Sequence, residues 1–183
     1  MLNLDDRVTH WVILLAAHHS VIDSILITAS AWAVPVLAAA VAIQWWSGED
    51  RRANRHTLVS AGLSFSLALG INQVILLFVH RVRPYDTGVS RLLIERSHDP
   101  SFPSDHATAT VAIAAAFLLH HAPRRASLFG AVALLVGFSR VYIGTHYSSD
   151  VLGGAFTGIL GALIIQRIYR RDTKLDRFIT GIL

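Results

Sequence analysis

Residues 22–46 read IDSILITASAWAVPVLAAAVAIQWW. A helix needs about 20 predominantly apolar residues to cross a bilayer, so this stretch is long enough. Pro35 lies inside it, and a membrane helix tolerates such a proline with a kink. Four more apolar stretches follow, at residues 57–79, 105–121, 126–143 and 151–169, of which 105–121 is shorter and rich in alanine. Because only helices and closed barrels satisfy the backbone in lipid, this pattern predicts an all-α, polytopic membrane helical bundle with about five transmembrane helices.

The composition agrees with a membrane protein. Hydrophobic residues make up 53% of the chain and charged residues 15%, whereas a soluble domain carries about 25% charged residues. The chain has no cysteine, which excludes disulfides, thiolate metal sites and cysteine nucleophiles. The net charge of +4 comes almost wholly from arginine, and it suits anionic lipid headgroups or anchoring of loops. We therefore expect the lipid bilayer and an anionic lipid as partners and no nucleic acid, and the sequence does not indicate an oligomeric state.

We expect one domain over residues 1–183. Residues 1–20 mix apolar and charged side chains and are too short and polar to span, so they predict an amphipathic helix in the membrane interface. Residues 22–169 form the transmembrane catalytic core, and residues 170–183 form a cytoplasmic tail. The N-terminus lacks the features of a signal peptide. The pair His18 and His19 is interpreted as solvated, with a metal site as the alternative.

Three polar clusters lie at the predicted membrane boundary, on the side that holds loops 80–104 and 144–149. Ionisable residues at the edges of spans are costly and tend to be functional. The clusters are His80-Arg81-Val82-Arg83-Pro84, then Pro103-Ser104-Asp105-His106, then Ser139-Arg140 with His146 and Asp150.

These clusters supply what phosphoryl transfer needs. Arginine binds phosphate oxygens through parallel hydrogen bonds, and Arg83 and Arg140 are the candidates, with membrane anchoring as the alternative. Ser104 follows a proline at a predicted helix start, where free backbone N–H groups bind anions. We interpret Ser104 as part of the phosphate site, and the alternative is that it only caps the helix.

The nucleophile predicted from the residues is His146. A neutral histidine can attack phosphorus, and a carboxylate on its other nitrogen fixes the tautomer. Asp150 lies four residues on, a spacing that brings two side chains together in a helix. His106 suits a general acid near neutral pH. Asp99, Asp105 and Asp150 could be pictured as magnesium ligands, but the arginines already supply positive charge, so we expect no metal and no cofactor.

At these residues the sequence resembles the type 2 phosphatidic acid phosphatase (PAP2) superfamily. The third motif of that family, Ser-Arg, five residues, His, three residues, Asp, is matched by Ser139, Arg140, His146 and Asp150. Its Pro-Ser-Gly-His motif is matched at Pro103, Ser104 and His106, and its Arg-Pro ending at Arg83 and Pro84. The resemblance covers residues 57–169. It implies His146 as nucleophile, Asp150 as its orienting partner, His106 as acid, and Arg83, Ser104 and Arg140 as phosphate ligands.

Two positions depart from the family pattern. Leu76 stands where the first motif has a lysine, so Arg81 or His80 is predicted to take over a phosphate contact. Asp105 stands where glycine is usual, and its backbone N–H can still bind phosphate. Aspartate at this place, and Asn72 before Arg-Pro, resemble the bacterial undecaprenyl-diphosphatase branch.

The resemblance therefore implies a metal-independent phosphatase that converts a polyprenyl diphosphate to the monophosphate and recycles a cell-wall lipid carrier. The nearest alternative is a broad lipid monophosphatase acting on phosphatidate or phosphatidylglycerol phosphate. A vanadate-binding haloperoxidase and a non-catalytic lipid binder or flippase are further alternatives; the five spans count against the former and the intact histidines against the latter.

The arginines also predict the orientation, because cytoplasmic loops carry an excess of Lys and Arg. Loops 47–56 and 122–125 and the C-terminal tail share one side and hold Arg51, Arg52, Arg55, Arg124, Arg125, Arg167, Arg170, Arg171, Lys174 and Arg177. On the other side, Arg83 and Arg140 are discounted as catalytic. We therefore expect the C-terminus in the cytoplasm and the site on the extracytoplasmic face of the plasma membrane.

Overall fold

The computed structural model describes residues 4–16 and 20–182, and in this part of the chain all regular structure is helical. The prediction of an all-α fold is thus confirmed. The elements are α1 (Leu4–Ile13), α2 (Ser20–Ile43), a short 3₁₀ turn η1 (Gln44–Trp46), α3 (Arg51–Leu76), α4 (Asp105–Leu119), α5 (Pro123–Tyr142), α6 (Ser148–Ile168) and α7 (Lys174–Thr180).

Four helices are long and apolar enough to cross a membrane: Ser20–Trp46, Arg51–Leu76, Pro123–Tyr142 and Ser148–Ile168. Many of their large apolar side chains face outward, including Leu134 at 78% exposure and Leu152 at 70%. Such a surface is unfavourable in water and suits lipid. The remaining predicted span, residues 105–121, corresponds to α4, which has 15 residues and is therefore only about 22 Å long.

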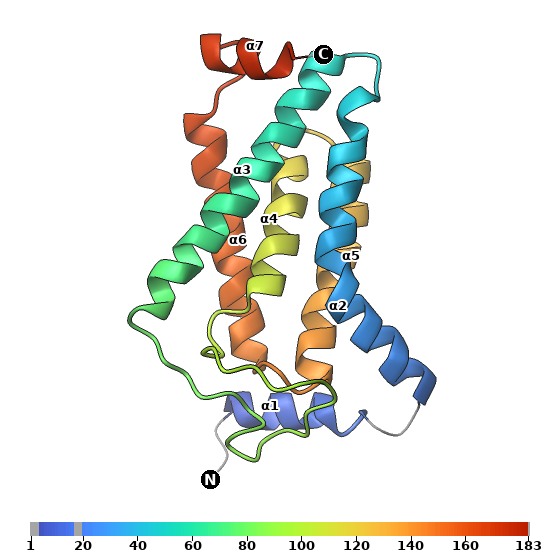
Figure 1. Cartoon of the computed structure of the whole chain (residues 1–183), viewed down its shortest axis with the longest axis vertical. Helices are drawn as coiled ribbons and strands as arrows, with labels where there is room; N and C mark the ends of the chain where they lie inside the picture. The colour runs from blue at the N-terminus through green and yellow to red at the C-terminus, as the bar shows by residue number, and fades with distance from the viewer. Residues whose placement is uncertain (1–3, 17–19, 183) are drawn as a thin grey trace.

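The short helix α4 is the centre of the bundle, packed against α3, α5 and α6 (Figure 1). Its small residues allow this close approach, since Ala107, Ala109, Ala112 and Ala116 are all buried. The glycines of α6 bring that helix close to both α4 and α3. A Cβ at Gly158 would lie 2.7 Å from the carbonyl oxygen of Thr108, and one at Gly161 would lie 2.8 Å from Cβ of Ala68. These glycines therefore serve helix packing.

Two short helices lie across the ends of the bundle (Figure 1). Helix α1, inside the segment predicted to be interfacial, lies at the end that holds the loop from residue 77 to residue 104. Helix α7 lies at the opposite end, inside the predicted tail, where Asp176 accepts a hydrogen bond from Tyr169 at 2.7 Å and faces Nδ1 of His56 at 2.8 Å. The polar clusters found in the sequence all fall at the α1 end.

Candidate active site

The loop between α5 and α6 carries His146 into the interior, where it is 3% exposed. The turn depends on Gly144, which has φ +82° and would place a Cβ 3.0 Å from the carbonyl carbon of Arg91. Ser90 fixes the turn from the long loop by donating to the carbonyl oxygen of Gly144 at 2.8 Å. The two loops therefore form one unit around the histidine.

The two ring nitrogens of His146 have different partners. Nδ1 lies 2.7 Å from the carbonyl oxygen of Ser101. Because a carbonyl only accepts, Nδ1 carries the proton and Nε2 is left bare. Nε2 faces Nη1 of Arg83 at 3.5 Å, and the nearest oxygen of Asp150 is 3.7 Å from Nδ1. The structure thus brings His146 and Asp150 together, but the hydrogen bond on Nδ1 goes to Ser101.

Burial is the main influence on the pKa of His146. It lowers the pKa, and the charges of Arg140 and Arg83 lower it further, while Asp150 acts in the opposite direction. The net direction is downward from the ordinary value of about 6.5. His146 is therefore neutral at neutral pH, as a nucleophile must be.

The carboxylate of Asp150 is fully buried and held on both oxygens. Oδ2 accepts from the hydroxyl of Ser101 at 2.5 Å and from the backbone N–H of Tyr147 at 2.8 Å. Oδ1 accepts from Nη1 of Arg81 at 2.6 Å. Ser101 therefore touches both members of the pair, through its carbonyl and its hydroxyl.

Arg83 is fixed by the long loop and points at the nucleophile. Its Nε donates to the carbonyl of Asp99 at 2.9 Å and its Nη2 to the Asp99 carboxylate at 3.0 Å, while Nη1 donates to the carbonyl of Thr145 at 3.0 Å. Burial alone would raise the pKa of Asp99, but hydrogen bonds from Ser97 and Arg83 and the charge of Arg83 hold it below its usual value. Asp99 is thus an anion that orients Arg83.

Two predicted phosphate ligands have buried atoms without a partner among the described residues. Arg140 is 8% exposed; its Nη1 donates to the hydroxyl of Ser30 at 2.6 Å, but its Nε has no partner. Ser104 is fully buried; it is the N-cap residue of α4, yet its hydroxyl makes no capping bond and has no partner. Ser60 Oγ and Asn72 Oδ1 are also buried without a partner among the described residues. Ser104 and Arg140 differ in that both belong to the motifs around His146, so their two atoms mark a place for a polar ligand.

The other predicted residues lie around this place. His106 stands at the start of α4, within electrostatic reach of Arg140, His146 and Arg83. Asp105 turns its carboxylate to Asn72, which donates to it at 2.6 Å. Arg81 is ion-paired with Asp5 and Asp150, at 2.6 Å each. The role of Arg81 as a phosphate ligand stays a prediction.

The sequence does not predict the roles of three contributors: Ser101, Asp5, and Asp99, which is considered there only as a magnesium ligand. Ser101 and Asp99 lie just before the Pro103-Ser104-Asp105-His106 cluster, but a backbone carbonyl that accepts a hydrogen bond has no signature in a sequence. Asp5 comes from a helix 76 residues away from Arg81. Only the fold brings these groups together.

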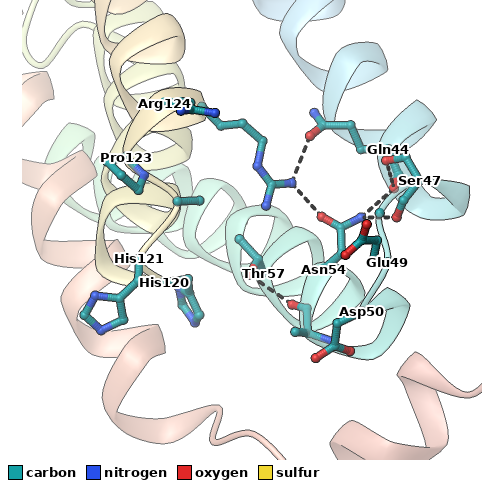
Figure 2. A pocket seen from close by; sticks show the side chains of 14 residues that line it. Gln44, Ser47, Glu49, Asp50, Asn54, Thr57, His120, His121, Pro123 and Arg124 are labelled. Atoms are coloured by element: carbon teal, nitrogen blue, oxygen red, sulfur yellow. Dashed lines mark hydrogen bonds between the residues drawn. The ribbon is translucent and has the colours of Figure 1, made fainter.

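Two cavities lie near polar residues. One of about 350 Å³ lies in the long loop, where Arg81, Arg83 and Asp99 belong to its lining. Figure 2 shows another, of about 670 Å³, at the α7 end, with Gln44 and Asn54 on one wall and His120, His121 and Arg124 on the other. Within residues 4–16 and 20–182, no group of three His, Asp or Glu is placed to hold a metal ion. His18 and His19 lie outside the described residues.

Known proteins resemble this chain in sequence and in fold. It is 36% identical to undecaprenyl-diphosphatase BcrC of Bacillus subtilis over 89% of this chain and 81% of that protein. It is 35% identical to phosphatidylglycerophosphatase B of Bacillus subtilis over 64% of this chain and 61% of that protein. The crystal structure of a transmembrane PAP2-type phosphatidylglycerolphosphate phosphatase from Bacillus subtilis superposes with a TM-score of 0.67 at 23% identity, covering 93% of this chain and 86% of that one.

The family follows from a match that covers most of the chain. Residues 57–174 match the PAP2 superfamily, and this range holds all the predicted catalytic residues. The likeness to a solved transmembrane member agrees in fold. The chain is thus an integral, multi-pass membrane protein that belongs to the PAP2 superfamily of metal-independent phosphatases.

Proposed function

We propose that this phosphatase hydrolyses a polyprenyl diphosphate of the undecaprenyl type to the monophosphate and inorganic phosphate, with His146 as nucleophile. The observation that supports it best is the pair of unpartnered buried atoms, Ser104 Oγ and Arg140 Nε, in the cluster of the bare Nε2 of His146. Phosphate oxygens bound there would satisfy both atoms.

In the first step Nε2 of His146 forms a bond to the terminal phosphorus. The bond from phosphorus to the bridging oxygen breaks, and its electron pair leaves with the lipid monophosphate. His106 acts in its protonated form, which the negative charge of the bound diphosphate stabilises, and it gives its proton to that oxygen. The positive charge on the ring is stabilised by the Ser101 carbonyl and by Asp150 at 3.7 Å.

In the second step water attacks the phosphohistidine. His106, now neutral, takes a proton from the water, and the N–P bond breaks with its electron pair returning to Nε2. Inorganic phosphate then leaves. Both steps spread charge over the non-bridging oxygens, which Arg83, Arg140 and Ser104 hold.

Asp105 contributes through its backbone. Its carboxylate is bound by Asn72, but it is the first residue of α4, and the first N–H groups of a helix have no partner within it. Such N–H groups favour anions. We therefore keep Asp105 as a phosphate ligand through its N–H.

The diphosphate is preferred as substrate because of the similarity to an undecaprenyl-diphosphatase over most of both chains and because of aspartate at position 105. The alternative is hydrolysis of a lipid monophosphate such as phosphatidylglycerol phosphate. It draws on the similarity to phosphatidylglycerophosphatase B. The phosphate site serves either substrate.

We also propose how the chain, as a single domain of residues 1–183, sits in the plasma membrane. Helix α4 crosses the membrane in addition to the four long helices, because it runs between the two ends of the bundle and is packed among those helices (Figure 1). Helix α1 lies in the interface on the site's side. The arginines concentrated at the α7 end favour that end as cytoplasmic, so the site faces the extracytoplasmic side.

The test is phosphate release by purified protein from undecaprenyl diphosphate, undecaprenyl phosphate and phosphatidate, side by side. We expect the diphosphate to give the highest kcat/KM and His146→Ala to be inactive while still folding. Faster release from phosphatidate would support the alternative, and full activity of His146→Ala would refute the nucleophile.

A further inference from the structure

Helix α1 is joined to the first turn of α6 by side chains that act as caps. The carboxylate of Asp5 accepts from the backbone N–H of Ser149 at 3.0 Å and from its hydroxyl at 2.5 Å. Thr9, which is fully buried, accepts from the backbone N–H of Ser148 at 3.0 Å. These are the first two N–H groups of α6, which a helix leaves unbonded. An element 139 or more residues away in sequence thus caps the helix that carries Asp150.

Arg81 connects this cap to the catalytic carboxylate. Its Nη2 donates to Asp5 at 2.6 Å, and its Nη1 donates to Asp150 and to the hydroxyl of Ser149, each at 2.6 Å. The guanidinium also lies over the ring of Tyr147, 3.9 Å from its centre. One arginine is therefore shared between a carboxylate on the interfacial helix and a carboxylate beside the nucleophile.

The two oxygens of Asp150 depend on different elements. Oδ2 is held by Tyr147 and Ser101, close to the nucleophile. For Oδ1, within the described part of the chain, the hydrogen-bond donor is Arg81. Arginine is long and its side chain is 29% exposed here, so a second anchor is needed to keep it in one place. Asp5 is that anchor.

The ionisation of Asp5 fits this role. Burial alone would raise its pKa, but hydrogen bonds from Ser149 and Arg81 hold the pKa below its usual value. Asp5 is therefore charged at neutral pH. A buried carboxylate such as Asp150 needs a fixed cation beside it, because an uncompensated charge in the interior is costly.

We infer that Asp5 is a positioning residue for the reaction: it holds Arg81 against Asp150, and so makes the interfacial helix α1 part of the catalytic unit. The inference rests on the proposed function for its assay. In this inference Arg81 is not a phosphate ligand. The two roles predict different effects on the binding of a phosphate mimic: loss of a phosphate ligand weakens it, and loss of a positioning residue does not.

The experiment is a double-mutant cycle with Asp5→Asn and Arg81→Gln in the full-length protein. Asparagine keeps an acceptor for Ser149 but loses the charge that pairs with Arg81. We expect Asp5→Asn to lower kcat by about tenfold, Arg81→Gln by somewhat more, and the double variant no further than Arg81→Gln alone, because both act along one path. Asp5→Glu should recover part of kcat, and the inhibition constant of orthovanadate should stay within about twofold of the native value.

Thr9→Val is the matched control, since it removes the other capping bond of α1 and leaves Arg81 untouched. It should lower the melting temperature yet keep kcat within about twofold. Three results would each overturn the inference. They are an unchanged kcat in Asp5→Asn, additive losses of kcat in the double variant, and a loss of kcat in Thr9→Val equal to that in Asp5→Asn. Weaker vanadate inhibition in Arg81→Gln would overturn it in favour of a phosphate ligand. No phosphate release by the native protein would instead refute the proposed function.

Discussion

His146 donates its Nδ1 proton to the carbonyl oxygen of Ser101 at 2.7 Å, and the carboxylate of Asp150 stands 3.7 Å from the same nitrogen. The tautomer of the nucleophile is therefore set by the backbone of the loop. Asp150 acts on the ring across a short gap, and its carboxylate is held in place by hydrogen bonds from Arg81, Ser101 and Tyr147. Ser101, which touches both residues, becomes as informative a target as either.

Ser101→Ala should lower kcat by about tenfold, because it removes one charge-assisted hydrogen bond to Asp150 but keeps the carbonyl that accepts from His146. Steady-state kinetics of the purified variant check this. Ser127→Ala is the control, since among the described residues that hydroxyl bonds to the carbonyl of Pro123, at the other end of the bundle. A loss as large as that of His146→Ala would mean that the hydroxyl itself takes part in the chemistry.

Ser104→Ala should leave thermal stability nearly unchanged but reduce kcat/KM by about 10²–10³, the usual effect of losing one oxyanion donor. The hydroxyl neither caps α4 nor bonds to any other described residue, so its removal costs the fold little. Ser60 offers a matched control, because its hydroxyl is also buried and has no partner in the described part of the chain, but lies in α3. Ser60→Ala should retain full activity; equal effects of the two variants would contradict the assignment of Ser104.

His106→Gln should distinguish the leaving groups. A phosphate monoester ionises with a pKa of about 6, so it leaves without much help from an acid. An alcohol ionises at a far higher pH, near the value of about 15.7 for water. We expect a loss of about tenfold on the diphosphate but about 10³ on a lipid monophosphate that the native enzyme turns over. Equal losses would show that His106 does not protonate the leaving oxygen.

The lowered pKa of His146 predicts that it stays reactive in mildly acidic solution. Its neutral form reacts, and that form is lost only as the pH falls through the folded pKa, which lies below the ordinary value of about 6.5. The measurement is carbethoxylation of the vanadate-protected histidine in His106→Gln, followed from pH 4.5 to 8. A midpoint above about 6.5 would mean that Asp150 outweighs burial and the arginines.

The chain has no cysteine, so single cysteines report the orientation without background. Glu95 lies in an exposed part of the long loop, and Glu49 lies in an exposed turn at the α7 end. The two variants are Glu95→Cys and Glu49→Cys. In intact cells an impermeant maleimide should label the first and reach the second only after permeabilisation. The reverse pattern would place the phosphate site on the cytoplasmic face.

The sequence predicted the helical bundle and the motif residues, because long apolar runs and fixed His, Arg and Asp spacings are local signals. The pairing inside the site could not be read in the same way. The spacing of His146 and Asp150 favoured a helical contact, but α6 begins only at Ser148, so the ring turns to Ser101 instead. Arg81 is predicted to contact phosphate because Leu76 stands where the family motif has a lysine. Its carboxylate partner on α1 depends on tertiary structure, which no local pattern encodes.

The glycines of α6 restrict how this enzyme can acquire new substrates. A Cβ at Gly154 would collide with the backbone of Ser104, and one at Gly158 with the backbone of Thr108 at 2.7 Å. Since α4 carries Ser104 and His106 and α6 follows directly from His146, these contacts fix the distance between acid and nucleophile. Even a single methyl group added at Gly154 or Gly158 would change that distance. Mutations that separate α4 from α6 therefore cannot widen the site without also displacing the catalytic groups. Changes in headgroup preference are instead expected in the part of the long loop that does not hold the site, away from Arg83, Asp99 and Ser101, where exchanges leave the spacing of the two histidines intact.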